Sequence, residues 1–312
     1  MDPLEDVLAL LGLRGHLSAG LRAGGRWAVR FRAPSGVKFN AVRQGACLLQ
    51  VEGVAEPVAL KEGDCYLLTR PLPYILRSDP DAVPVDAESV FATTDRGLAR
   101  TGDGDHDEVL LIGGHFSLSE RSPALLLNEL PPVVHVPAGS EHAETLRWAL
   151  AQISEELLRG RMGSSLVAEH LAAVMFVHVL RLHLAHSTGT TVGLLAGLRD
   201  PVVATALTSL HERPERPWTV ADLARVCAVS RSTLAARFKD LVGQGPIDYL
   251  GRWRVELAAQ RLRRSDATIA AIARTVGYGS ESAFSTAFKR ITGVPPREYR
   301  ARRPDTATES GR

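Results

Sequence analysis

The stretch VGYGSESAFSTAFKRITGVPP, residues 276–296, has the pattern of a glycine-rich corner followed by an amphipathic helix. Fifty residues earlier, VCAVSRSTLAARFKDLVGQGP has the same plan. Upstream, the triplets at 223–225 and 272–274 match at an offset of 49, so the second copy has one extra residue in its corner. The spacing predicts two helix-turn-helix units. The identities at an offset of 50 pair Ser230, Ser232, Phe238, Lys239, Gly243, Pro246 and Tyr249 with residues 280, 282, 288, 289, 293, 296 and 299.

The second helix of each unit has a core face and an outward face. Leu234, Phe238 and Leu241 form the first core stripe, and Phe284, Phe288 and Ile291 form the second. A helix in a DNA major groove presents its N-terminal half to the bases. We therefore expect base-edge contacts from the outward residues Ser232, Ala235, Ala236, Ser282, Ser285 and Thr286. Phosphate contacts are expected from Arg231, Lys239, Lys289 and Arg290.

The stretch between the units, residues 246–265, predicts one long helix with Trp253, Leu257 and Leu262 in its core. A rigid connector of this kind fixes the separation of the two reading helices. Two such helices on one face of DNA enter successive major grooves, roughly 34 Å apart. This spacing explains why the motif is duplicated.

The charge is distributed unevenly along the chain. The net charge of +2 combines −5 over residues 1–199, +8 over residues 200–303 and −1 over residues 304–312. Arginine outnumbers lysine 33 to 4, so arginine abundance by itself indicates little. Its excess at one end predicts that the C-terminal third binds a polyanion.

The N-terminal part has a different pattern. Between residues 25 and 136, short apolar or alternating runs are separated by Gly, Pro and Asp clusters, which predicts many short strands in an antiparallel β-barrel or sandwich. The polar segments 78–89 and 93–108 are interpreted as loops. The fold class is therefore α+β: an N-terminal antiparallel β-barrel with helices, then an all-α domain.

The period changes to a helical one near residue 141. Two helices over 141–186 are expected to be buried or to form a subunit interface, the second being apolar nearly all round. The predicted organisation is a sensor domain at 1–140, a helical dimerisation region at 141–186, a linker at 187–199, a DNA-binding domain at 200–303 and a disordered tail at 304–312. The acidic N-terminus has no cleavage signal and no apolar run reaches membrane length, so a cytoplasmic protein is expected.

The two repeat units resemble the DNA-binding domain of the AraC/XylS transcriptional regulators, over about residues 210–303. The resemblance implies a sequence-specific, promoter-binding regulator that is a homodimer and contacts RNA polymerase if it is an activator. The family commonly has arginine at the outward positions that match Ala236 and Thr286. Without those arginines, the target is expected to be read more through thymine methyls, DNA shape and phosphates.

The N-terminal half resembles the cupin sensor domains attached to many of these regulators, on the residues VKFNAVRQGACLLQVEG, VALKEGDCYLL, LLIGGHF and PPVVHVP. Metal-binding cupins carry histidines at positions where this chain has Phe39-Asn40 and Tyr74-Ile75-Leu76. No metal, cofactor or catalytic residue is therefore predicted. A small-molecule effector is expected, with pocket candidates Phe39, Asn40, Tyr66, Tyr74 and His115.

Two alternatives stay open from the sequence. A thiol redox sensor would use Cys47 and Cys65, which are expected on neighbouring strands, although buried cysteines commonly behave as small hydrophobic residues. A cupin enzyme would need a metal-ligand set, which the motifs lack.

Overall fold

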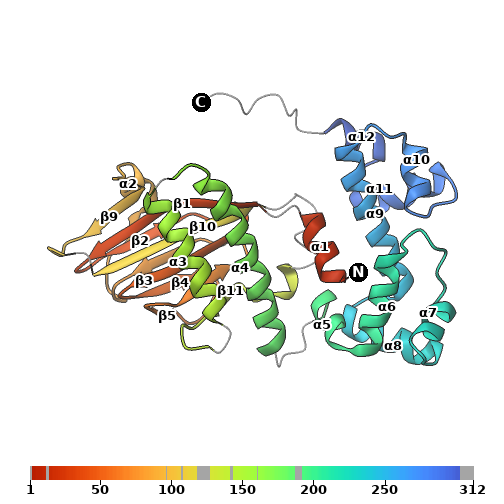
Figure 1. Ribbon diagram of the computed structural model, residues 1–312, viewed down its shortest axis with the longest axis horizontal. Helices are drawn as coiled ribbons and strands as arrows, with labels where there is room; N and C mark the ends of the chain where they lie inside the picture. Colours follow the sequence, from red (N-terminus) through yellow and green to blue (C-terminus); the bar gives the residue numbers. More distant parts are fainter. Residues whose placement is uncertain are drawn as a thin grey trace. The chain divides into compact units, whose positions relative to one another are not determined.

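The computed structural model describes the chain except residues 1, 12–13, 96, 107, 118–126, 141–142, 160, 187–191 and 303–312. It comprises two compact units. One contains residues 12–123 and 130–188, and the other contains residues 1–11, 124–129 and 189–312. The first is β-rich and the second is helical (Figure 1). The α+β class expected from the sequence is confirmed.

Two β-sheets form the β-rich unit. The six-stranded sheet has the order β11-β6-β3-β10-β1-β9, and the five-stranded sheet has the order β5-β4-β7-β2-β8. Most neighbours are antiparallel, but β9 pairs with β1 and β8 pairs with β2 in parallel. The strands are β1 Arg14–Gly24, β2 Ala28–Phe31, β3 Val37–Gln44, β4 Ala46–Val51, β5 Val58–Lys61, β6 Cys65–Leu68, β7 Tyr74–Arg77, β8 Val85–Asp86, β9 Leu98–Gly102, β10 Val109–Ser117 and β11 Val133–Val136.

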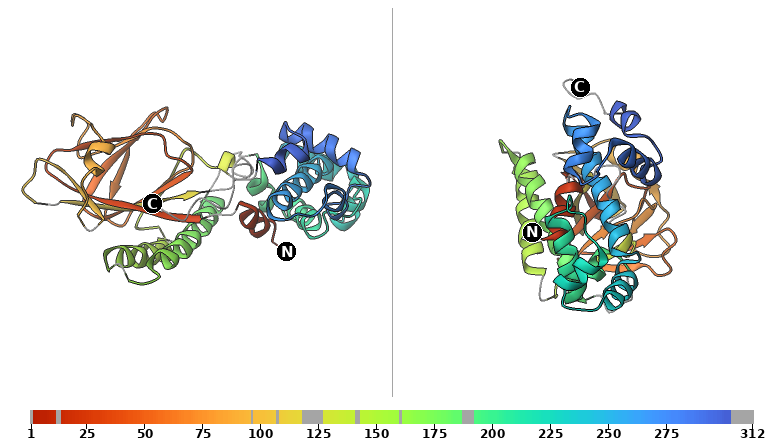
Figure 2. Two further views of the ribbon diagram at one scale, coloured as in Figure 1. Left: turned by 90° about the horizontal axis from the view of Figure 1, so that it is seen from above. Right: turned by 90° about the vertical axis from the view of Figure 1, so that its right-hand side faces the viewer.

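A hydrophobic core lies between the sheets. Val42 and Leu111 come from the six-stranded sheet, and Leu49 and Leu76 come from the five-stranded sheet. Because side chains alternate along a strand, the opposite face of the six-stranded sheet needs a separate cover. Helices α3 (Ala143–Arg159) and α4 (Ser164–His186) belong to the same unit and lie along the sheet (Figure 2). Phe116 of β10 meets Phe176 of α4, with ring centroids 5.2 Å apart.

The segments that were interpreted as loops are partly regular structure. Residues 78–89 contain β8 and the start of helix α2 (Ala87–Phe91), and residues 93–108 contain β9. Both strands lie at sheet edges, where parallel pairing with β1 or β2 satisfies the backbone. An edge strand with exposed polar side chains has no hydrophobic pattern, so the loop interpretation of these parts was wrong.

The helical unit contains both repeats. Its helices are α1 Pro3–Leu11, α5 Leu194–Arg199, α6 Pro201–Glu212, α7 Val220–Val226, α8 Arg231–Val242, α9 Pro246–Arg264, α10 Ile269–Thr275, α11 Glu281–Thr292 and α12 Pro296–Ala301. A short 3₁₀ turn, Leu127–Glu129, belongs to the same unit. The described unit thus includes segments from three distant parts of the sequence.

Helix α1 is joined to the helical unit by a buried histidine. His211 of α6 approaches Asp6 with Nδ1 at 3.2 Å and the Tyr249 hydroxyl with Nε2 at 2.7 Å. Its ring stacks on Trp253 at a centroid distance of 4.1 Å. Burial lowers the pKa of His211 to about 3, so the ring is neutral and acts as a hydrogen-bonding spacer at neutral pH. The domain organisation predicted from the sequence places α1 in the sensor domain, residues 1–140, whereas residues 1–11 group with the helical unit in the structure.

The segment 187–199 was interpreted as a linker, but residues 194–199 form helix α5. Its N-terminus is held by Glu129, whose carboxylate accepts hydrogen bonds from the backbone N–H groups of Leu194 at 2.5 Å and Leu195 at 2.7 Å. A carboxylate at a helix N-terminus satisfies donors that have no partner within the helix. Because Glu129 lies 65 residues upstream, no local pattern around residue 194 indicates this helix.

Candidate nucleic-acid interface and sensor cavity

The two helix-turn-helix units are α7 with α8 and α10 with α11, and the second helix of each has the same kind of cap at both ends. The Ser230 hydroxyl accepts from the backbone N–H of Thr233, and the Ser280 hydroxyl accepts from that of Ala283. Gly243 and Gly293 end α8 and α11 in the left-handed conformation, each with φ 81°. Both reading helices therefore begin and end at matching positions.

The corners differ by one residue, as the sequence predicted. Four residues separate α7 from α8 and five separate α10 from α11. In the first corner Ala228 has φ 54°, a conformation that favours glycine. In the second corner Gly277 takes φ 89°. The same change of chain direction is made with a strained alanine in one unit and with glycine in the other.

The core stripes and the outward faces are as the helical period predicted. Leu234, Phe238, Phe284 and Phe288 are completely buried. Leu241 and Ile291 are half-buried. Among the outward candidates, Ala235 and Ser285 are half-buried, and the other eight are exposed: Arg231, Ser232, Ala236, Lys239, Ser282, Thr286, Lys289 and Arg290.

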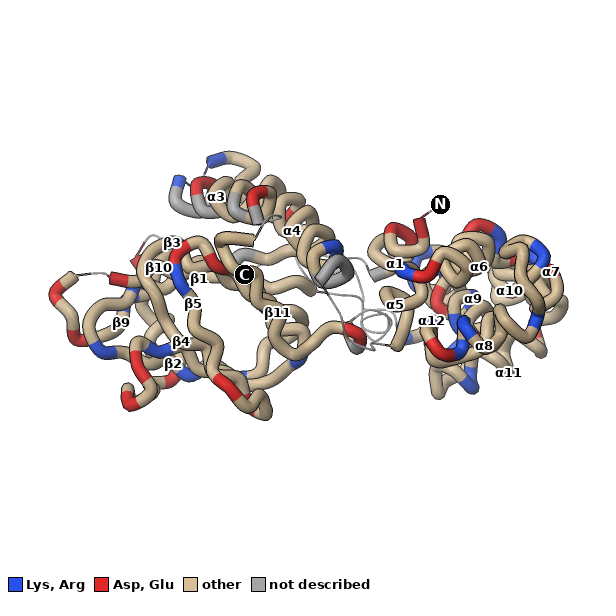
Figure 3. The backbone as a smooth tube through the Cα atoms, turned by 90° about the horizontal axis from the view of Figure 1, so that it is seen from below, with Lys and Arg blue, Asp and Glu red and all other residues tan. Residues whose placement is uncertain are grey.

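The four cations chosen for phosphate contacts are free of ion pairs within the part of the chain that the structure describes. By contrast, Arg237 of α8 lies 3.4 Å from Asp200, and Arg225 of α7 lies 3.0 Å from Asp222. Basic positions are marked along the helices of this unit in Figure 3. An exposed cation without an internal partner is available to a phosphate.

A residue that the sequence did not single out positions the second unit. Arg254 of α9 donates from Nε to the Pro214 carbonyl at 2.6 Å and from Nη2 to the Arg216 carbonyl at 2.8 Å. Its guanidinium also lies over the Tyr278 ring of the second corner, 5.8 Å from the centroid. The connector helix is thereby tied to the segment before α7 and to the corner before α11.

The β-rich unit contains a cavity of about 310 Å³ between its sheets. Of the five pocket candidates, Asn40 and Tyr74 line it. Phe39 lies on the opposite face of β3, with its ring 4.8 Å from that of Phe116. Tyr66 is fully buried and accepts a hydrogen bond from Asn40 Nδ2 at 2.6 Å, while the ring of His115 stacks on His16 at 4.9 Å.

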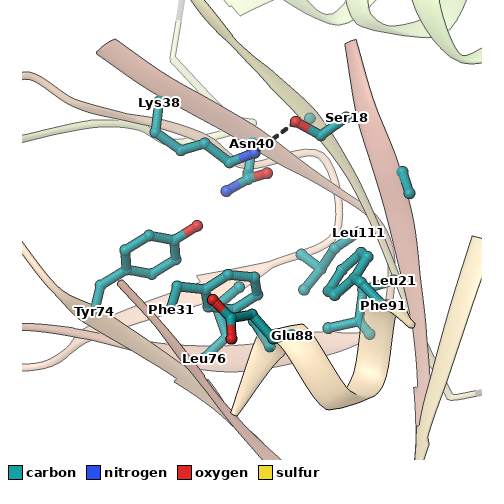
Figure 4. Close-up of a pocket in the computed structure, with 13 residues that line it drawn as sticks. Ser18, Leu21, Phe31, Lys38, Asn40, Tyr74, Leu76, Glu88, Phe91 and Leu111 are labelled. Atoms are coloured by element: carbon teal, nitrogen blue, oxygen red, sulfur yellow. Dashed lines mark hydrogen bonds between the residues drawn. The ribbon is translucent and has the colours of Figure 1, made fainter. Parts of the chain in front are cut away.

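Two lining residues missed in the sequence are Lys38 and Ser18. Lys38 Nζ donates to the Ser18 hydroxyl at 3.1 Å (Figure 4). Burial lowers the pKa of Lys38 to about 8. A lone lysine in a strand does not by itself indicate a ligand cavity, because the sequence does not show which face of the strand points to the core.

The cysteines do not lie as the redox alternative requires. Cys47 is on β4 of the five-stranded sheet and Cys65 is on β6 of the six-stranded sheet, so the expectation of neighbouring strands was wrong. Cys47 points into the core between the sheets, whereas Cys65 does not belong to that core. Burial raises the pKa of both thiols to about 12, which disfavours the reactive thiolate.

Comparison with known proteins identifies both parts of the chain. A cupin family model matches residues 2–185, and a helix-turn-helix domain model matches residues 223–302. A putative AraC-like transcription regulator of Streptomyces lividans is 64% identical over 96% of this chain and 98% of its own length. The chain belongs to the AraC-like family of transcription regulators.

Further relatives of this AraC-like regulator are more distant. The HTH-type transcriptional regulator AlkR of Acinetobacter baylyi is 30% identical over 96% of this chain and 99% of its own length. Among solved structures, the DNA-binding domain of AdpA in complex with a target DNA is 32% identical, with a TM-score of 0.32, over 33% of this chain and 91% of that one.

The family membership confirms a DNA-binding transcription regulator with an N-terminal cupin domain. Its relatives carry the names of transcriptional regulators, and neither the redox sensor nor the cupin enzyme is supported. Among the described residues, no group of three or more His, Cys, Asp or Glu side chains is placed to hold a metal ion. None of the described helices is long and apolar enough to cross a membrane.

Proposed function

We propose that this AraC-like regulator reads an operator with α8 and α11 in successive major grooves, and that a small molecule in the cavity of the cupin unit is its effector. The observation that carries the DNA-reading part is the repeat itself. Two helices of 12 residues have the same caps, and each leaves an outward face with free cations. The long helix α9 between them supplies a rigid spacer.

Base selection is assigned to a small set of side chains. Ser232, Ala236, Ser282 and Thr286 are exposed, and Ala235 and Ser285 lie at the edges of the same faces. Hydroxyls donate to or accept from base edges, and alanine or threonine methyls contact thymine methyls. A target rich in A·T pairs, read partly through its shape, follows from this set.

The phosphate role is tested by salt dependence. Lys239→Ala and Lys289→Ala should each weaken binding to all sequences and reduce the slope of log affinity against log salt by about one unit. Lys61→Ala is the matched control, because Lys61 is an exposed lysine on β5. A gel-shift titration in which Lys239→Ala keeps the wild-type slope would remove that residue from the phosphate contacts.

The base-reading role is tested by selection of binding sites from random DNA. Ser285→Ala or Thr286→Ala should change the preferred bases in one half-site by roughly 1–3 kcal/mol at a contacted pair. The half-site read by α8 should stay the same in both variants. A selected consensus identical to that of the wild type would exclude these side chains from base readout.

Helices α3 and α4 are proposed as the dimer interface. Trp148 on α3 is 55% exposed, and Leu166, Val167 and Val174 on α4 are 61%, 45% and 40% exposed. Apolar side chains in such numbers on neighbouring helices favour an interface. Sedimentation of a Trp148→Glu variant should show more monomer than the wild type at equal concentration. An unchanged dimer fraction would place the interface elsewhere.

The remaining assignments complete the proposal. The regulator is a bacterial cytoplasmic protein associated with the nucleoid, catalyses no reaction, and contacts RNA polymerase if it activates transcription. In vitro transcription from a promoter found by genomic footprinting, with and without the regulator, tests the sign of regulation.

A further inference from the structure

The cavity of the cupin unit has a polar side and an apolar side (Figure 4). The tips of Lys38, Asn40 and Tyr74 point toward one another across one part of it, and Ser18 lies beside the lysine. The opposite part is lined by the hydrocarbon side chains Leu21, Phe31, Leu76, Phe91 and Leu111. A ligand that matches both parts has one compact polar group and a small apolar body.

The Lys38 ammonium determines the sign of that polar group. Its hydrogen bond goes to a neutral hydroxyl, and within the described residues no carboxylate forms an ion pair with it. Burying a cation without a counter-charge is costly. A carboxylate in the cavity would supply both the missing charge and acceptors for the ammonium.

The acid nearest the cavity does not serve as that counter-charge. Glu88 of α2 lines the cavity, but its side chain is 70% exposed and lies 2.9 Å from Arg32. Figure 4 shows its carboxylate on the same part of the cavity as the ring of Phe31, away from Lys38. The rim therefore does not present an unpaired negative charge to an entering anion.

We propose that the cavity binds a small organic monocarboxylate, with the carboxylate on Lys38 and a compact apolar body against Phe31, Leu76 and Leu111. The proposal rests on the sensing role given above to the cupin unit and names the ligand class. A volume of about 310 Å³ lies at the small end of ligand cavities, which favours an aryl or short alkyl body over a long chain. Asn40 and Tyr74 complete the polar side.

The buried and half-buried titratable groups near Lys38 have pKa values that are shifted away from 8, so they do not account for a change of ligand affinity near that pH. His115, on β10, pairs in register with Lys38, and burial, then His16 and Lys38, lowers its pKa below the ordinary value. His16, on β1, is exposed and bonded to Ser117. Burial raises the pKa of Tyr66 on β6 and of Tyr74 on β7 above the ordinary value for tyrosine. A change in affinity near pH 8 therefore reports on the lysine.

Calorimetric titration of the full chain tests the proposal with two isosteric probes, hydrocinnamate and its neutral amide. Wild-type protein should bind the carboxylate roughly 10- to 100-fold more tightly than the amide, as expected for a charge-assisted hydrogen bond to a half-buried ammonium. The advantage should disappear in Lys38→Met, which keeps an unbranched side chain one heavy atom shorter and removes the charge. It should also shrink in the wild type as the pH rises through about 8, because Lys38 loses its proton.

Lys61→Met is the control, since Lys61 is exposed on β5 of the same unit and should leave both affinities unchanged. Equal binding of acid and amide by the wild type, no binding of either, or a carboxylate preference that survives Lys38→Met would each overturn the proposal. Gel-shift affinity for DNA is measured on the same proteins. If the wild-type protein does not bind DNA, the regulator function is contradicted. If it binds DNA but does not prefer the carboxylate to the amide, only the ligand class is contradicted.

Discussion

Replacing Gly277 with alanine should destabilise the second helix-turn-helix unit. Gly277 has φ 89°, and an ideal Cβ there would lie 2.5 Å from the carbonyl oxygen of Glu215 and 2.7 Å from its Cα. The backbone of residues 214–216 cannot retreat freely, because Arg254 bonds the Pro214 and Arg216 carbonyls on either side. The corner must therefore open or the connector must shift.

The magnitude follows from two costs and one compensation. The left-handed conformation costs an alanine about 1–2 kcal/mol, and overpacking against backbone costs about 1–3 kcal/mol. The loss of glycine's freedom in the unfolded chain returns about 0.4–1 kcal/mol. We expect the opening free energy of the second unit to fall by about 3 kcal/mol, within a range of about 1–4.6 kcal/mol.

Gly279, in the same corner, supplies the matched control. It has no atom within 4 Å of an added Cβ, and it is not among the glycines with positive φ. Gly279→Ala should therefore change the opening free energy by less than about 0.5 kcal/mol. The pair separates the effect of the backbone position from the effect of adding a methyl group to the corner.

Native-state hydrogen exchange of the full chain, followed by mass spectrometry, measures the effect. In Gly277→Ala, peptides from α10 and α11 should exchange at least about tenfold faster, because about 1.4 kcal/mol is a factor of ten. Peptides from the β-rich unit should be unaffected. Exchange in α11 equal to that of Gly279→Ala would refute the reasoning, because it would mean that the close approach to Glu215 costs nothing.

Three further predictions follow from side-chain environments. Burial raises the pKa of Glu129 from 4.5 to about 7, so the folded state holds this proton more tightly than the unfolded chain. Its contribution to the free energy of unfolding is therefore fully present below pH 4.5 and is lost as the pH rises through 7. Denaturant unfolding measured against pH should show this fall in the wild type and lack it in Glu129→Gln. Asp200 caps α6 through the N–H groups of Val202 and Val203, so Asp200→Ala should cost about 1–2 kcal/mol in urea unfolding. With a thiol reagent, Cys227 should react first, because it is half-buried whereas Cys47 and Cys65 are buried; rapid labelling of all three in the native state would contradict this.

The helical unit was largely predictable from the sequence because its signals are local. Thr219 with Asp222, three residues on, forms a capping box at the start of α7, and Asp200 followed by proline begins α6. The long connector is present as α9 over residues 246–264. Caps act within three or four residues, so the sequence that encodes them is contiguous.

The β-rich unit was less predictable because its pairings join distant residues. The 11-residue strand β1 was missed, since Arg14–Gly24 alternates too weakly to indicate a strand. It pairs with β10, nearly a hundred residues away, and with β9. Which residues of β3 line the cavity depends on which face of the strand each side chain is on. Lys38 and Asn40 line it, while Phe39 between them points to the opposite face. A one-residue change of register would exchange these roles.

The two segments that join the helical unit from distant parts of the sequence also bear on the effector role proposed above. Helix α1 directly precedes β1, which contributes Ser18 and Leu21 to the cavity. The turn with Glu129 follows β10, which contributes Leu111. Each segment is held to the helical unit by buried polar contacts, at His211 for α1 and at the N-terminus of α5 for Glu129. Under the effector role proposed above, a ligand that shifts β1 or β10 would act on chain segments that are bonded to the helical unit. Coupling of this kind requires that the bonded and released arrangements differ in affinity for the ligand.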